Sequence, residues 1–187
     1  IRQFEDREIP RDVLERILDA GLKAPSSNHQ RKWELVTLTD KSIIRDLAAL
    51  IRPYPCRIQE PRTPQQEMFK IAYPRQRSMV EESACVILPY FKQKYAFDNP
   101  KNDYGLMDYG AAWALVENLL LAAIAESLGS VVHIPVKKEP EQIKTFMKIP
   151  DGYYLPALVI LGYPAKDALL PAQVKATVEN RVHWNKW

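Results

Sequence analysis

Cysteine, histidine and glycine are scarce in this sequence: its 187 residues hold two, three and six of them. Cys56 and Cys85 are too far apart for a Cys-x-x-Cys motif, and one pair builds no disulfide framework. His29, His133 and His183 are scattered along the chain, so they predict no set of metal ligands. These absences exclude a small disulfide-rich scaffold and favour a reducing, cytoplasmic setting without a metal centre.

An excess of charge of one sign is missing as well. The chain has 26 Lys and Arg against 23 Asp and Glu, a net charge of +3, and shows no dense basic stripe. A nucleic-acid partner is therefore not expected. The longest apolar run, residues 110–125, is interrupted by Glu117 and Asn118 and falls short of the ~20 apolar residues of a membrane span. We expect no membrane partner and no signal peptide.

The apolar pattern that is present predicts helices alternating with strands. Helices are expected at 10–23, 40–50, 65–82, 107–128 and 140–147, and strands at 33–39, 84–90, 130–134 and 155–162. Four prolines make a loop of residues 52–64, and Pro74 should bend or restart the third helix. We expect an α+β fold, one sheet with helices on its faces, in a single domain over residues 1–187.

The helix predicted at 107–128 is apolar on nearly all sides. Such a helix is buried on nearly all sides, and a chain of this size has little interior to surround about six turns. Burial in an interface between subunits is the favoured interpretation. A central core helix inside a monomer is the alternative.

The stretch from Ala24 to Trp33 is dense in hydrogen-bonding groups for a surface loop. Its Pro-Ser-Ser start can simply end the first helix. It can equally be a binding loop, and the residues alone support both interpretations.

The chain resembles the nitroreductase family, homodimeric oxidoreductases that depend on FMN. The residues that carry the resemblance follow the family's order: Ile1-Arg-Gln-Phe4, Ile9-Pro10, Ala24-Pro-Ser-Ser27, Trp33, Asp108-Tyr-Gly-Ala-Ala112, Ile149-Pro-Asp-Gly-Tyr153 and Leu161-Gly-Tyr-Pro164. The match is patchy from residue 52 to 102. The resemblance implies a dimeric three-layer α/β/α sandwich with a mostly antiparallel central sheet, FMN as cofactor, NAD(P)H as reductant and a small-molecule electron acceptor.

The resemblance also implies contacts with the flavin. Arg2 matches the cation that the family places against the N1/O2 edge of the ring, where reduction puts negative charge. The backbone of His133 or Ile134 would meet the N5/O4 edge, because Pro135 has no N–H. Lys175 matches the basic position for the phosphate. Without the resemblance, the two cations would be read as solvated surface charges. The family's upstream Arg and Ser are not in the sequence, which begins inside this motif.

In the family, the Pro-Ser-Ser turn of one subunit meets the flavin of the other. Pro25, Ser26 and Ser27 match that turn, and His29 stands where the family usually has Asn. Arg31-Lys32 replaces the usual Gln-Pro and, together with His29, makes the loop more basic, which favours either an acidic ligand or a different contact with the ring.

Catalysis in the family comes from the flavin, which accepts hydride from NAD(P)H and passes it to a nitroaromatic, quinone or activated alkene. No single catalytic residue is predicted. Residues 90–100 are aromatic and basic, and they either cover the substrate or form a helix that packs on the sheet edge. Two other functions stay open: another flavin reaction on this scaffold, such as reductive dehalogenation or flavin fragmentation, and a non-enzymatic flavin-binding or interaction protein.

Overall fold

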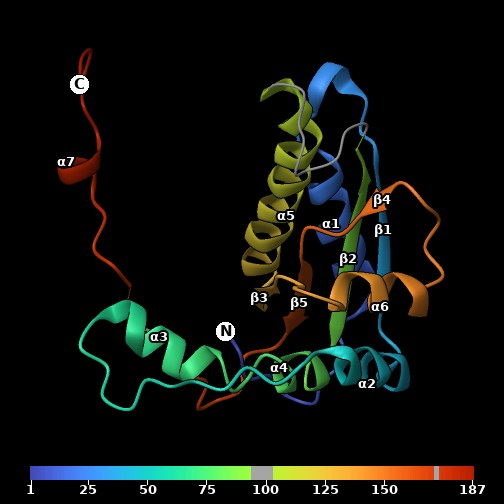
Figure 1. The fold of residues 1–187 in the computed structure, drawn as a ribbon, viewed down its shortest axis with the longest axis horizontal. Coiled ribbons are helices and arrows are strands. Elements are labelled where there is room, and N and C mark those ends of the chain that lie inside the picture. Colours follow the sequence, from blue (N-terminus) through green and yellow to red (C-terminus); the bar gives the residue numbers. More distant parts are fainter. Residues whose placement is uncertain (94–102, 171–172) are drawn as a thin grey trace.

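A computed structural model describes residues 1–93, 103–170 and 173–187 and confirms the α+β sandwich, with helices on both faces of one sheet (Figure 1). The sheet has five strands in the described residues, and all their pairings are antiparallel. Its order is β1 (Trp33–Leu38), β2 (Cys85–Lys92), β5 (Leu158–Gly162) and β3 (Gly129–His133), while β4 (Tyr153–Tyr154) pairs with the end of β2.

The helices form the two outer layers. One layer holds α1 (Arg11–Leu22) and α5 (Met107–Ala125), and the other holds α2 (Lys41–Leu50), α4 (Ser78–Glu81) and α6 (Glu139–Phe146). Helix α3 (Pro64–Ala72) lies to one side, and α7 (Val178–Arg181) belongs to a C-terminal tail that leads away from the sheet (Figure 1). The short 3-10 turns are η1 (Ser27–His29) and η2 (Asp103–Leu106).

The buried apolar side chains form two clusters, one on each face of the sheet. Strand β2 contributes to both, because its side chains alternate between the two faces. Cys85, Ile87 and Phe91 pack with α1 and α5, whereas Val86 and Leu88 pack with α2, α4 and α6. Burial on both faces explains why the strand reads as one apolar run.

Local signals in the sequence set several boundaries. Asp40 caps α2 by accepting from Ser42 N at 2.7 Å and Ile43 N at 3.4 Å. Helix α3 stops at Ala72, ahead of Pro74, and α4 begins afresh at Ser78, so the predicted restart is confirmed. Strand β4 was not predicted, because two residues carry no detectable period.

Helix α5 ends at Ala125, three residues before its predicted end at 128. Its buried side chains pack on α1 and the sheet, but Leu121 and Ile124 are 57% and 64% exposed. By length and composition it is the one helix in the described part of the chain that could cross a membrane, a test that soluble core helices also pass. One such helix is weak evidence of a membrane span, and the buried side chains of α5 belong to the hydrophobic core.

Candidate functional site

The N-terminal arm, which precedes α1, crosses the ends of β3 and β5. The ammonium group of Ile1 donates to Ser130 O at 3.2 Å. Gly162 allows the close approach of Phe4, since a Cβ there would lie 2.7 Å from its ring. These contacts fix the backbone on both sides of Arg2.

Arg2 is a half-buried cation. Its Nη2 lies 3.8 Å from Sδ of Met68 in α3, and its Nε is buried with no hydrogen-bond partner. No carboxylate of the described chain forms an ion pair with it. Burial lowers the pKa of the guanidinium. Such a group has hydrogen-bonding capacity for a negatively charged or electron-rich ligand atom.

Arg75, in the turn between α3 and α4, supports Arg2. Its Nε donates to Arg2 O at 2.8 Å, and its guanidinium forms an ion pair with Glu82. Arg75 therefore holds the arm, and its own charge is balanced within the chain.

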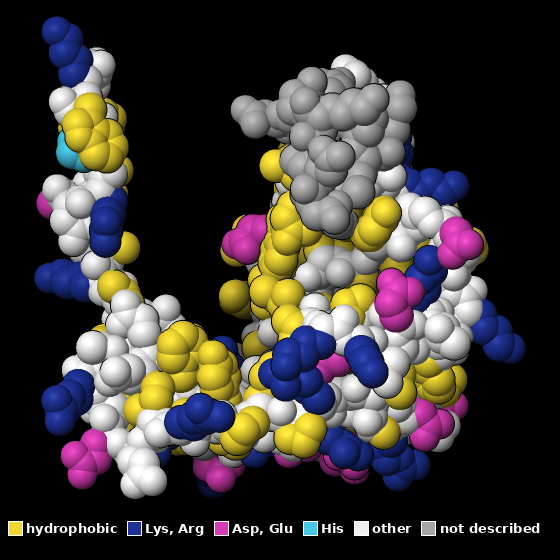
Figure 2. All heavy atoms as spheres, viewed as in Figure 1, with side chains coloured by type: hydrophobic (Ala, Val, Ile, Leu, Met, Phe, Trp, Pro, Cys, Tyr) yellow, Lys and Arg dark blue, Asp and Glu magenta, His cyan; other side chains and the backbone are white. Residues whose placement is uncertain are grey.

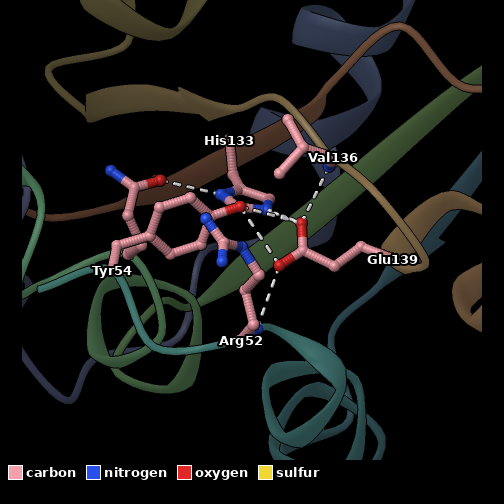
Figure 3. Close-up of polar contacts among 6 residues, drawn as sticks. Arg52, Tyr54, His133, Val136 and Glu139 are labelled. Atoms are coloured by element: carbon pink, nitrogen blue, oxygen red, sulfur yellow. Dashed lines mark hydrogen bonds and ion pairs between the residues drawn. The ribbon is translucent and has the colours of Figure 1, made fainter.

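His133, at the end of β3, is 1% exposed and its ring is engaged on both sides (Figure 3). Nδ1 lies 2.7 Å from Oε1 of Gln76, and Nε2 lies 3.1 Å from Oε2 of Glu139. Burial lowers the pKa of His133, and the Glu139 carboxylate acts in the opposite direction. Both ring nitrogens therefore contact buried protein groups. The residue can meet a ligand only through its backbone, whereas the next residue, Ile134, is 52% exposed.

Glu139, the first residue of α6, is only 2% exposed, and several donors surround its carboxylate (Figure 3). Oε1 accepts from Arg52 N at 3.0 Å and from the Tyr54 hydroxyl at 3.1 Å. Oε2 accepts from Val136 N at 2.9 Å. Burial raises the pKa of Glu139, but these donors and His133 together hold it below its usual value. No sequence pattern predicts this cluster, because an acidic residue in a first helical turn is ordinarily a solvated one.

The loop after α1 carries the predicted Pro25, Ser26, Ser27 and His29. Ser26 Oγ accepts from Arg31 N at 3.0 Å. Asn28, His29 and Arg31 have φ values of 49°, 55° and 44°, in the left-handed region. The loop therefore does more than end a helix, because it forms a turn that its own hydroxyl stabilises.

A groove of about 380 Å³ joins this loop to the start of α5. It is lined by Pro25, Ser26, Ser27, Leu106, Met107, Gly110, Ala111 and Ala114. The basic character predicted for the loop is reduced, because Lys32 forms an ion pair with Asp108 at 3.3 Å. Of the two basic residues that follow His29, Arg31 alone forms no ion pair in the described residues.

The loop that follows α1 and the N-terminus of the chain, beside which Arg2 lies, are at opposite ends of α5 (Figure 1). The Pro-Ser-Ser loop contacts the start of α5 at Met107, whereas Ile1 contacts Ser130, just beyond its end. A helix of 19 residues is about 28 Å long. A single chain therefore does not bring Ser26 to Arg2.

Lys175 is exposed on the C-terminal tail, which Figure 1 shows leading away from the sheet. No hydrogen bond or ion pair in the described chain ties Lys175 to another predicted residue. Its assignment to a phosphate stays a prediction.

A second cavity, of about 530 Å³, lies beside Ile134. Tyr90 and Phe91 of β2 and Tyr153 and Tyr154 of β4 line it, beyond the part of β2 that pairs with β5. Several aromatic rings line it, and the centroid of the Phe91 ring lies 6.1 Å from the ring centroids of both Tyr109 and Tyr154. The predicted substrate-covering segment contributes its first two residues here, and residues 94–100 lie outside the described part. The residues of the chain that the structure describes include no cluster of three or more metal-ligating side chains.

Comparison with known proteins identifies the family. The model of the nitroreductase family matches residues 1–163. This chain belongs to the nitroreductase family. It is 24% identical to a Methanothermobacter thermautotrophicus protein provisionally named NADH dehydrogenase/NAD(P)H nitroreductase, over 100% of the chain and 82% of that protein. It is 25% identical to iodotyrosine deiodinase of Nematostella vectensis, over 96% of the chain and 69% of that protein.

A solved structure shares the fold. Iodotyrosine deiodinase bound to FMN and 3-iodo-L-tyrosine superposes with a TM-score of 0.75 at 19% identity, over 100% of this chain and 94% of that one. The α+β sandwich predicted from the sequence is therefore the fold of this family.

Proposed function

We propose that this chain is an FMN-dependent oxidoreductase that oxidises NAD(P)H and reduces a small-molecule acceptor such as a nitroaromatic or a quinone. The single observation that carries the proposal is the half-buried Arg2 guanidinium, which lacks a counter-charge in the described chain. Membership of the nitroreductase family supports it.

The residues present fit a flavin. Arg2 would hold the ring edge that becomes negative on reduction, with its backbone fixed by Arg75. The backbone at Ile134 would meet the opposite edge, and Lys175 would bind the phosphate. FMN, when bound, supplies the hydride chemistry. The protein orients it, stabilises charge and excludes water.

The proposed assembly is a homodimer, because the site is incomplete in one chain. Pro25, Ser26, Ser27 and His29 would complete the flavin site of a second copy. Figure 2 shows hydrophobic side chains gathered along α5, on the side that faces the tail across an open space. The tail also exposes large apolar side chains, with Leu170 at 77% and Trp184 at 78%. A second copy seated there would cover both surfaces.

An absorption spectrum before and after adding FMN tests the proposal. We expect the protein to retain FMN through gel filtration, NADH or NADPH to bleach the flavin band, and an acceptor to restore it. A protein that retains no FMN contradicts the cofactor assignment. A flavoprotein that NAD(P)H does not bleach is a flavin-binding protein of another kind.

Reductive dehalogenation is the second candidate, favoured by similarity to iodotyrosine deiodinases. The aromatic walls of the cavity beside Ile134 suit a halogenated phenol. Two electrons and a proton would replace the carbon–halogen bond by a carbon–hydrogen bond and release halide. Iodide release from 3-iodo-L-tyrosine by the reduced protein, compared with reduction of a nitroaromatic, separates the two candidates.

A further inference from the structure

The Glu139 carboxylate joins segments that are distant in sequence (Figure 3). It accepts from Arg52 N and the Tyr54 hydroxyl, which belong to the loop after α2, and from Val136 N, which belongs to the turn between β3 and α6. It also contacts His133 at the end of β3. One buried carboxylate therefore ties both ends of the β3–α6 turn to the loop after α2.

The turn itself, residues 134–138, needs such support. Lys137 has a φ of 59°, in the left-handed region that non-glycine residues rarely adopt. Glu139 N donates to Val136 O at 3.1 Å, and Val136 N donates back to the Glu139 carboxylate at 2.9 Å. The carboxylate therefore closes the turn from one side while the backbone closes it from the other.

The same cluster reaches Arg2 through two neighbouring residues. Gln76 contacts the His133 ring at 2.7 Å, and Arg75 donates to Arg2 O at 2.8 Å. The Gln76 amide is itself oriented by a hydrogen bond to Ala72 O at 3.0 Å. The turn at 75–76 thus fixes the arm that carries Arg2 relative to the strand end that carries Ile134.

We infer that Glu139 is a positioning residue for the flavin site: its buried carboxylate holds the β3–α6 turn, and through His133 and Gln76 it sets Ile134 and Arg2 at a fixed separation. The inference rests on the proposed function. Glu139 itself touches no cofactor in this account and acts through the backbone that it holds.

Glu139→Gln is the direct test, because the amide keeps the size of the side chain but replaces one acceptor oxygen with a donor. Either Val136 N or Arg52 N then loses its partner. Tyr54→Phe is the matched control, since it removes a hydroxyl from the same carboxylate and leaves both backbone donors paired.

Amide hydrogen exchange of the FMN-free protein measures the local stability of the β3–α6 turn directly. In Glu139→Gln we expect exchange in residues 134–139 to accelerate about tenfold, the equivalent of one hydrogen bond, with α5 unchanged. Tyr54→Phe should exchange like the wild type. Unchanged exchange of the turn in Glu139→Gln would overturn the inference.

Measurements of flavin binding distinguish a positioning role of Glu139 from a role in the stability of the fold alone. At a temperature where circular dichroism shows every variant folded, Glu139→Gln should bind FMN with a Kd raised about tenfold and a shifted midpoint potential, whereas Tyr54→Phe should match the wild type. Equal Kd and potential in all three proteins would overturn the positioning role alone. A wild type that binds no FMN would overturn the proposed function and this role with it. If Glu139→Gln does not fold, Gln76→Leu serves instead, with a change in the same direction expected and an unchanged Kd and potential contradicting the inference.

Discussion

At the scale of single residues, the site contrasts two charged groups. Arg2 has a buried Nε without a partner and no ion pair in the described chain, whereas Glu139 accepts from three donors in two separate segments. A charge left unpaired in a partly buried position costs stability. The simplest reason to keep Arg2 there is a ligand that pairs with it, while Glu139 is a structural anion.

Replacing Arg2 tests this assignment. Arg2→Ala should lower the reduction potential of bound FMN by tens of millivolts, because a charged hydrogen bond contributes ~1.5–3 kcal/mol. Arg7→Ala is the control: Arg7 belongs to the same arm but stacks on the Tyr163 ring, 3.7 Å from its centroid. Redox titration measures both. A potential that is equally unchanged in the two variants places Arg2 away from the ring.

His133 makes the stability depend on pH. Burial lowers its folded-state pKa, so the unfolded chain binds a proton first as the pH falls through ~6.5. The free energy of unfolding then decreases as the pH falls from this value to the folded-state pKa of His133. Glu139, whose pKa is also lowered, adds a loss of the same sign at lower pH. Urea unfolding of the wild type at about pH 7 and about pH 5.5 should show this loss.

The His133→Gln substitution removes the titrating ring. The free energy of unfolding of this variant should therefore fall less than that of the wild type between about pH 7 and about pH 5.5. A variant with the same pH slope as the wild type would show that another group causes the loss.

At the scale of elements, the arm depends on glycine. A Cβ at Gly162 would lie 2.7 Å from Phe4, whereas one at Gly110 would meet nothing within 4 Å. Gly162→Ala should therefore displace the arm at a cost of ~1–3 kcal/mol and weaken FMN binding. Thermal unfolding and FMN titration measure both effects. Gly110→Ala should leave the melting temperature unchanged or raise it, and equal melting temperatures of the two variants would contradict the account.

Sequence reasoning found most elements because their signals are local. The Asp40 cap and the break near Pro74 each act within a few residues. The Glu139 cluster was missed for the opposite reason. Its members Tyr54 and Glu139 are 85 residues apart, and neither has a local pattern that predicts burial. Arg2 and the Pro-Ser-Ser loop were found through the family resemblance, and their flavin contacts remain predictions.

At the scale of the whole molecule, one chain keeps apart the two groups of residues that we propose for the flavin site. Arg2 lies beyond the C-terminal end of α5 and the Pro-Ser-Ser loop lies at its N-terminal end. Leu121 and Ile124 between them are more than half exposed. A second copy placed against α5 would bring unlike halves together and cover this apolar surface, so cofactor binding and dimerisation should be linked.

Sedimentation velocity, followed at the visible absorption band of FMN, decides whether flavin binding and dimerisation are linked. We expect flavin to sediment only with a dimer and added FMN to tighten the dimer. Ser26→Ala with Ser27→Ala should weaken both effects without unfolding α1, and riboflavin, which lacks the phosphate, should tighten the dimer much less than FMN. Flavin that sediments with a monomer, or a dimer that neither FMN nor the two substitutions affect, would contradict the account.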